Sequence, residues 1–133
     1  TGGWSPTRPM DRGRRFVLAV TLLAGLFMTA AGVAALLTPS WFADAAGFPR
    51  HTHFVHDAGA FQLGIGVTTL LALLWPDGLL AALTGFAVAS ALHTVSHWTD
   101  RSIGGHGSDV PSLALLTVVA LVAIYLRLRE RKP

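Results

Sequence analysis

Four long apolar segments constrain this chain more than any other feature. They span residues 16–37, 58–75, 79–98 and 110–128. A bilayer core takes roughly 20 residues of helix to cross, and a spanning segment must satisfy its own backbone hydrogen bonds. Strands of a membrane barrel would be shorter and would alternate apolar with polar residues. The sequence therefore predicts an all-α fold, a four-helix transmembrane bundle that forms one domain over residues 16–128.

The charged residues support this prediction by their scarcity and their positions. Only 13% of the chain is charged, about half the share of an ordinary soluble domain. The basic residues flank the apolar segments: Arg8, Arg12, Arg14 and Arg15 precede the first, Arg127, Arg129, Arg131 and Lys132 follow the last, and only Arg50 and Arg101 lie between. This pattern predicts two cytoplasmic termini by the positive-inside rule, and no nucleic-acid partner.

The two ends of the chain are predicted to be basic tails. Residues 1–15 form a flexible tail, in which residues 1–9 are rich in Gly and Pro and Met10 is the predicted native start. Residues 129–133 form the second tail. The first apolar segment is too long for the core of a signal peptide. Nine arginines against one lysine, with abundant Ala and Gly, indicate a bacterial gene, and so a multi-pass protein of the bacterial cytoplasmic membrane.

A short helix is predicted in the first outer loop, between the first two apolar segments. Thr38 suits the N-cap position, Pro39 suits the first helical position, and Gly47 is a stop signal. Trp41 and Phe42 are side chains that favour a membrane interface. We therefore expect this helix to lie at the outer interface.

All the histidines are predicted to lie on the extracytoplasmic side. They are His51, His53, His56, His93, His97 and His106. The second and third apolar helices are antiparallel neighbours joined by a tight turn at residues 76–78. The start of one, residues 51–57 (HTHFVHD), should therefore lie beside the end of the other, residues 93–100 (HTVSHWTD). His51 and His106, in loops, are expected to be solvated.

Small residues predict how these two helices meet. Ala60, Gly64 and Thr68 follow His56 at intervals of four, and Gly85 and Ala89 precede His93 at the same interval. Residues four apart share a helix face, and small residues let membrane helices approach closely. We expect two such stripes to pack together, with the histidines where the seam opens outward.

The histidine and aspartate cluster is a candidate site for a transition metal ion. Two histidines at i and i+4 can direct ring nitrogens at one ion, and a carboxylate can complete or orient the shell. The chain has no cysteine, and a nitrogen and oxygen site suits Zn²⁺ or Cu²⁺. The candidate ligands are His56, His93 and His97, with Asp57 or Asp100 as a fourth ligand or its support, and His53 in reserve.

Other functions fit the same residues. In one alternative the histidines serve only at the interface and bind no metal, and the protein is an accessory subunit of a larger membrane complex or a homo-oligomer. A bundle can also supply axial histidines to haem, and a metal-activated water could hydrolyse a lipid. The sequence favours a non-catalytic protein without deciding the question. His56 with His93 or His97 would be the haem ligands.

A family resemblance adds to this picture. The element Pro-Ser-Trp-Phe-Ala…Gly-Phe-Pro at residues 39–49 and the stretch HDAGAFQLGIG at residues 56–66, set among four apolar helices, resemble small bacterial membrane proteins of the DoxX-like kind. The resemblance covers about residues 16–126. It implies a four-helix membrane bundle that sometimes works as a partner subunit, and it implies no particular activity or site residues.

Overall fold

The computed structural model describes residues 11–130 and contains five α-helices in that range. They are α1 (Arg12–Leu37), α2 (Pro39–Ala46), α3 (Thr52–Leu71), α4 (Leu79–Thr99) and α5 (Asp109–Glu130), with a short 3-10 helix η1 (Pro76–Gly78) before α4. The all-α prediction is confirmed. The expected loose segment at residues 1–9 lies outside the described residues, as do residues 131–133.

The second long helix differs most from its apolar segment. α3 begins at Thr52 and ends at Leu71, so it starts earlier and ends earlier than the apolar residues 58–75. Its first two turns carry His53, His56 and Asp57. A helix can continue through polar residues because its backbone bonds do not depend on hydropathy. At its other end, Pro76 favours an extended or turn conformation in the preceding residue.

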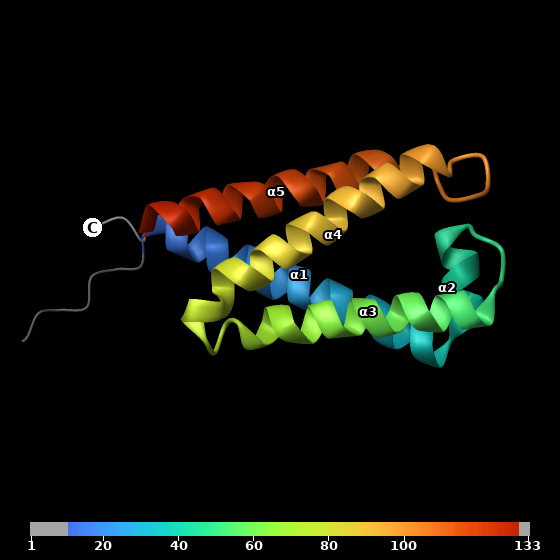
Figure 1. Cartoon of the computed structure of the whole chain (residues 1–133), viewed down its shortest axis with the longest axis horizontal. Coiled ribbons are helices and arrows are strands. Elements are labelled where there is room, and N and C mark those ends of the chain that lie inside the picture. The colour runs from blue at the N-terminus through green and yellow to red at the C-terminus, as the bar shows by residue number, and fades with distance from the viewer. Residues whose placement is uncertain (1–10, 131–133) are drawn as a thin grey trace, which may run out of the picture.

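The long helices form two close pairs, α1 with α3 and α4 with α5. At the right-hand end of Figure 1 the pair α4–α5 lies above the pair α1–α3, and the two pairs separate toward this end of the bundle. We call it the histidine end, because it holds residues 37–57 and 93–109. The opposite end, with η1 and the two ends of the described chain, is called the terminal end. At the terminal end, Arg127 Nη2 donates a hydrogen bond to the backbone oxygen of Pro76, at 2.9 Å.

Glycines set the close approach of α1 and α3. A Cβ added at Gly66 would lie 2.5 Å from the backbone nitrogen of Thr29, and one at Gly32 would lie 2.5 Å from that of Leu63. Real Cβ atoms do not approach a backbone nitrogen so closely, so only glycine permits this crossing. Gly59 and Gly66, seven residues apart, form the α3 side of the contact.

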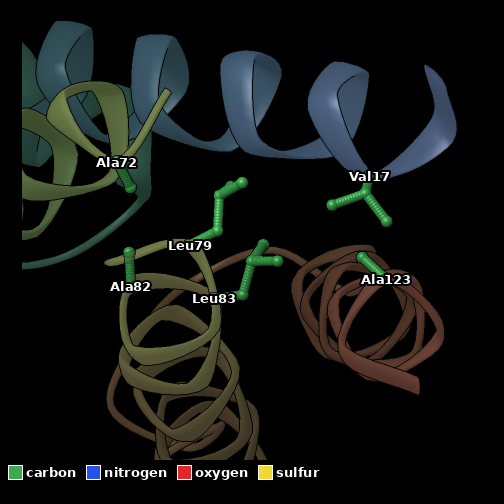
Figure 2. Close-up of a cluster of buried hydrophobic side chains, with 6 residues drawn as sticks. All are labelled: Val17, Ala72, Leu79, Ala82, Leu83 and Ala123. Atoms are coloured by element: carbon green, nitrogen blue, oxygen red, sulfur yellow. The ribbon is translucent and has the colours of Figure 1, made fainter. Parts of the chain in front are cut away.

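The apolar core lies toward the terminal end. Figure 2 shows its side chains, which come from α1, α4 and α5 and from the turn after α3: Val17, Ala72, Leu79, Ala82, Leu83 and Ala123. A second buried group, nearer the middle of the bundle, contains Ala24, Phe86, Ala87 and Ala120. No buried apolar cluster fills the histidine end among residues 11–130, and that is where the helix pairs have separated.

The predicted short helix is present as α2. Pro39 occupies its first turn and Gly47 ends it in the left-handed conformation, with φ of 72°. Thr38 occupies the N-cap position of α2, as expected, but its side chain makes no capping hydrogen bond: its hydroxyl donates to Ala34 O at 2.8 Å, within the last turn of α1. Ala43 is buried against its neighbours, so α2 packs onto the histidine end.

Three helical segments are long and apolar enough to cross a membrane: Arg12–Leu37, Pro76–Thr99 and Asp109–Glu130. Large apolar side chains on these helices point outward, for example Leu23, Leu92 and Leu121, as lipid-facing residues do. α3 has 20 residues, but its polar groups, among them His56, Asp57 and Gln62, lower its hydropathy.

Candidate functional site: a chamber at the histidine end

Two loops close the histidine end of the bundle. We call them the loop cap, which consists of residues 45–50 and 104–109. The backbone nitrogen of Gly105 donates to Gly47 O at 2.9 Å. Gly105 has φ of 87°, a conformation that glycine adopts without strain. A Cβ added at Gly104 would lie 2.5 Å from Gly47 O. The two loops therefore meet backbone against backbone.

Asp109, at the start of α5, organises the polar groups under the loop cap. Its Oδ2 atom lies 3.2 Å from His97 Nδ1 and accepts the backbone N–H of His106 at 2.6 Å. The side chains of His97 and Asp109 are only 14% and 22% exposed. One carboxylate thus joins the end of α4 to the start of α5 and to the loop between them. A negative charge at a helix N-terminus is also favourable.

Aromatic and histidine contacts extend this arrangement. The ring of Phe48 meets the ring of His97 edge to face, with centroids 5.3 Å apart. His106 Nε2 lies 3.0 Å from Ala45 O, so His106 bridges to the end of α2 even though it is exposed. The expectation that His106 is merely solvated is therefore not met. The rings of His93 and His97 lie 4.7 Å apart, centroid to centroid.

Arg50 and Asp44 form an ion pair on the exterior of the same end. Arg50 Nε donates to Asp44 Oδ1 at 2.7 Å. This hydrogen bond, together with the guanidinium charge, lowers the pKa of the Asp44 carboxyl. The same bond, together with the carboxylate charge of Asp44, raises the pKa of Arg50. Both groups are well exposed. The pair therefore fixes the loop after α2 against the helix but contributes little stability.

A chamber of about 550 Å³ lies beneath the loop cap. Its wall includes one phenylalanine from each of the first four α-helices: Phe27, Phe42, Phe61 and Phe86. Its polar lining residues include Gln62, Ser90, His93, His97, His106 and Asp109. Ligand pockets in proteins commonly have this size and this combination of apolar wall and few polar groups.

One polar atom in the chamber lacks a partner. The Oε1 atom of Gln62 is buried, and no donor among residues 11–130 reaches it. A buried acceptor without a hydrogen bond costs roughly 1–3 kcal/mol. Gln62 lines the chamber, so a donor placed there would satisfy the Oε1 atom once the side chain turns toward it.

A second cavity, about 710 Å³, runs between α3 and α4 toward the terminal end. We call it the lateral groove. Ala60, Gly64 and Thr68 line one side and Gly85 lines the other, and all four are exposed. A Cβ added at Gly64 or Gly85 would meet nothing within 4 Å. The stripes expected to pack together therefore line an open groove, because α3 makes its close contact with α1 instead.

The structure distributes the predicted metal ligands over several places. His53 lies on the exterior of α3, with its side chain 76% exposed and its Nε2 3.4 Å from Asp57 Oδ2. Asp100 ends α4, where its carboxylate accepts hydrogen bonds from Ser96 and Thr99. His56 is partly exposed and has no hydrogen bond or ion pair within the described chain.

Only His93 and His97 of the predicted ligands line the chamber. Across residues 11–130, no group of three or more histidine, aspartate or glutamate side chains is arranged to hold a metal ion. The closest carboxylate to this pair belongs to Asp109, which was not among the predicted ligands. Its position at the start of the last apolar segment, on the side shared by the histidines, is the sequence signal that could have identified it.

Gln62 is the other functional candidate that the sequence pattern did not single out. It is the one amide in the long apolar helices, and a polar group at such depth usually bonds across helices. In the structure Gln62 lines the chamber, and its Oε1 atom has no hydrogen-bond donor among residues 11–130.

Comparison of the chain with protein-family models, with curated proteins and with solved structures finds no match, and the DoxX-like resemblance stays a prediction.

Proposed function

We propose that this protein binds a small amphipathic molecule in the chamber at the histidine end. The observation that carries the proposal is the chamber itself: about 550 Å³ of space whose apolar wall meets a few polar groups, one of them the partnerless Oε1 atom of Gln62. An apolar body would contact Phe27, Phe42 and Phe86, and a hydrogen-bond donor would reach Gln62.

The proposal includes a place in the cell. The chain is a four-helix protein of a bacterial cytoplasmic membrane, with α3 as the fourth spanning helix, both termini cytoplasmic and the histidine end extracytoplasmic. The three apolar segments support it, as do the close pairing of α3 with α1 and the basic residues at the terminal end. A binding protein of this kind needs no catalytic group, and an accessory role in a larger complex is compatible with it.

The test is binding of 1-aminoanthracene, which has a flat apolar body and one amine donor. The protein, in lipid nanodiscs, is titrated by fluorescence and compared with two variants. Ala89→Phe fills the chamber, which Ala89 lines. Val88→Phe adds a ring at a neighbouring exposed position that lines neither cavity. Saturable binding of one probe per chain is expected in the wild type and in Val88→Phe, and only nonspecific partition in Ala89→Phe. Equal signals from all three would refute the chamber.

Binding of Zn²⁺ or Cu²⁺ is a second candidate, favoured by the 4.7 Å separation of the His93 and His97 rings. Two imidazoles need further ligands, which water would have to supply. Elemental analysis of protein purified without chelator is the test. This candidate predicts one ion per chain in the wild type and in the exterior variant His53→Ala, and none in His93→Ala/His97→Ala. A metal-free wild type would exclude it, and a Soret band would instead indicate haem.

A further inference from the structure

The chamber and the lateral groove adjoin each other. Phe61, Ile65 and Phe86 line both cavities. The chamber lies toward the histidine end and carries the histidines and Asp109, whereas the lateral groove extends toward Trp75 at the terminal end. Together they form one path, polar at one end and apolar at the other, along the face where α3 and α4 separate.

The lateral groove has the dimensions and the exposure of a site for one hydrocarbon chain. Its α3 side runs from Ala60 to Leu71, which is about 17 Å of helix at 1.5 Å per residue. Half of a bilayer core is about 15 Å thick. Phe61 and Trp75, at its edges, are exposed, so the lateral groove opens sideways to the surroundings of the helices. A lipid tail could enter it from the bilayer without crossing a polar surface.

The polar groups of the chamber define the head of that lipid. Gln62 Oε1 requires a donor, which a hydroxyl supplies. Asp109 already places a carboxylate at the chamber, and His97 is paired with it. An anionic head would lie near that negative charge and would lose its hydration in an apolar setting. A neutral hydroxyl head meets neither penalty.

We propose that the ligand is a neutral, single-chain lipid with a hydroxyl-bearing head, such as a monoacylglycerol, whose tail lies in the lateral groove and whose hydroxyl donates to Gln62. This inference rests on the proposed function of the chamber and specifies the class of its ligand. A lipid with one tail matches the single lateral groove between α3 and α4.

Native mass spectrometry with 1-monolauroylglycerol tests the inference. Gly85→Leu places a bulky side chain in the lateral groove, at a position where a Cβ meets nothing within 4 Å. Thr84→Leu places the same side chain at an adjacent exposed position that lines neither cavity, and is the control. One lipid adduct is expected in the wild type and in Thr84→Leu. Affinity should fall at least about tenfold in Gly85→Leu, since losing contact for about two methylene groups has that effect.

Two further lipids and one variant test the head. Methyl laurate lacks a hydroxyl and laurate is charged, and both should bind at least about tenfold more weakly than the monoacylglycerol, a difference of 1.4 kcal/mol. Gln62→Leu should remove the preference over methyl laurate. Equal binding of all three lipids, or full binding to Gly85→Leu, would overturn the inference.

The 1-aminoanthracene experiment separates the two proposals. If Gly85→Leu binds that probe as the wild type does but the wild type does not bind the monoacylglycerol, the chamber stands and the lipid assignment fails. If the wild type binds neither molecule, the proposed function fails as well.

Discussion

His97 and Asp109 lie at facing ends of neighbouring helices, with Nδ1 3.2 Å from Oδ2. His97 lies in the last turn of α4, and Asp109 is the first residue of α5. Their contact places a paired carboxylate at the rim of the chamber and closes the loop between α4 and α5. The same Oδ2 atom accepts the His106 N–H, so the loop conformation and the histidine position depend on one side chain.

Replacing Asp109 should destabilise the histidine end. Asp109→Ala leaves the His106 N–H and the His97 ring without their partner. Loss of one partner in a largely buried hydrogen bond costs about 1–3 kcal/mol. Unfolding in mixed micelles, followed by circular dichroism, should show that decrease. Asp57→Ala removes a carboxylate from the exposed pair with His53 and is the control. A decrease of the same size in both variants would contradict the special role of Asp109.

Two glycines on α3 should respond oppositely to the same substitution. Gly66→Ala places a Cβ 2.5 Å from the Thr29 backbone, so α1 and α3 must move apart, at a cost of about 1–3 kcal/mol. Gly64→Ala meets nothing within 4 Å and should be neutral or more stable by about 0.5–1 kcal/mol, because alanine favours helix. The free energy of unfolding of the two variants measures the difference. Equal destabilisation would mean that α3 does not contact α1 through Gly66.

The sequence predicts the helices well because hydropathy and turn chemistry are local properties. Pro39 and Gly47 identify α2, and residues 76–78 identify the turn before α4. It predicts the pairing of helices poorly, because α3 carries two faces of small residues. Gly64 belongs to the face with four-residue spacing, and Gly59 and Gly66 to the other. The face of α3 that packs against a neighbour is decided by how closely the backbone of α1 approaches, and no local sequence pattern predicts that approach.

The candidate site was likewise predictable from the sequence only in part. The sequence places all the histidines at one end, and the structure places His93 and His97 beside each other there. The sequence could not exclude His53 from the candidate ligands, because the face that α3 turns toward its neighbours depends on the rotation of the helix about its own axis. Nor could it indicate the chamber, because a cavity is the space that five helices leave unfilled. Gln62 becomes informative only when its oxygen is known to lack a partner.

The ion pair of Asp44 and Arg50 should give a pH-dependent contribution to stability. The hydrogen bond from Arg50 lowers the pKa of Asp44 in the folded protein. The ionised Asp44 carboxylate therefore stabilises the folded protein at pH values above the ordinary aspartate pKa, near 3.9. This contribution is lost as the pH falls through the lowered pKa of Asp44 in the folded protein. Thermal unfolding of Asp44→Asn and wild type should differ slightly at neutral pH and converge in acid. Arg50→Gln, which breaks the same pair, should give the same profile, and a difference that grows in acid would contradict it.

Two exposed glycines at opposite ends of the bundle can test the proposed orientation. Gly107 lies in the loop before α5 and Gly78 at the end of η1, and a side chain at either position meets nothing within 4 Å. The chain has no cysteine, so each single-cysteine variant carries one thiol. A membrane-impermeant maleimide applied to intact spheroplasts should label Gly107→Cys at once and Gly78→Cys only after the membrane is permeabilised, because the basic residues retain the terminal end inside. The opposite pattern would reverse the orientation. Labelling of both thiols in intact spheroplasts would show that the two ends share one side, and would exclude α4 and α5 as spanning helices.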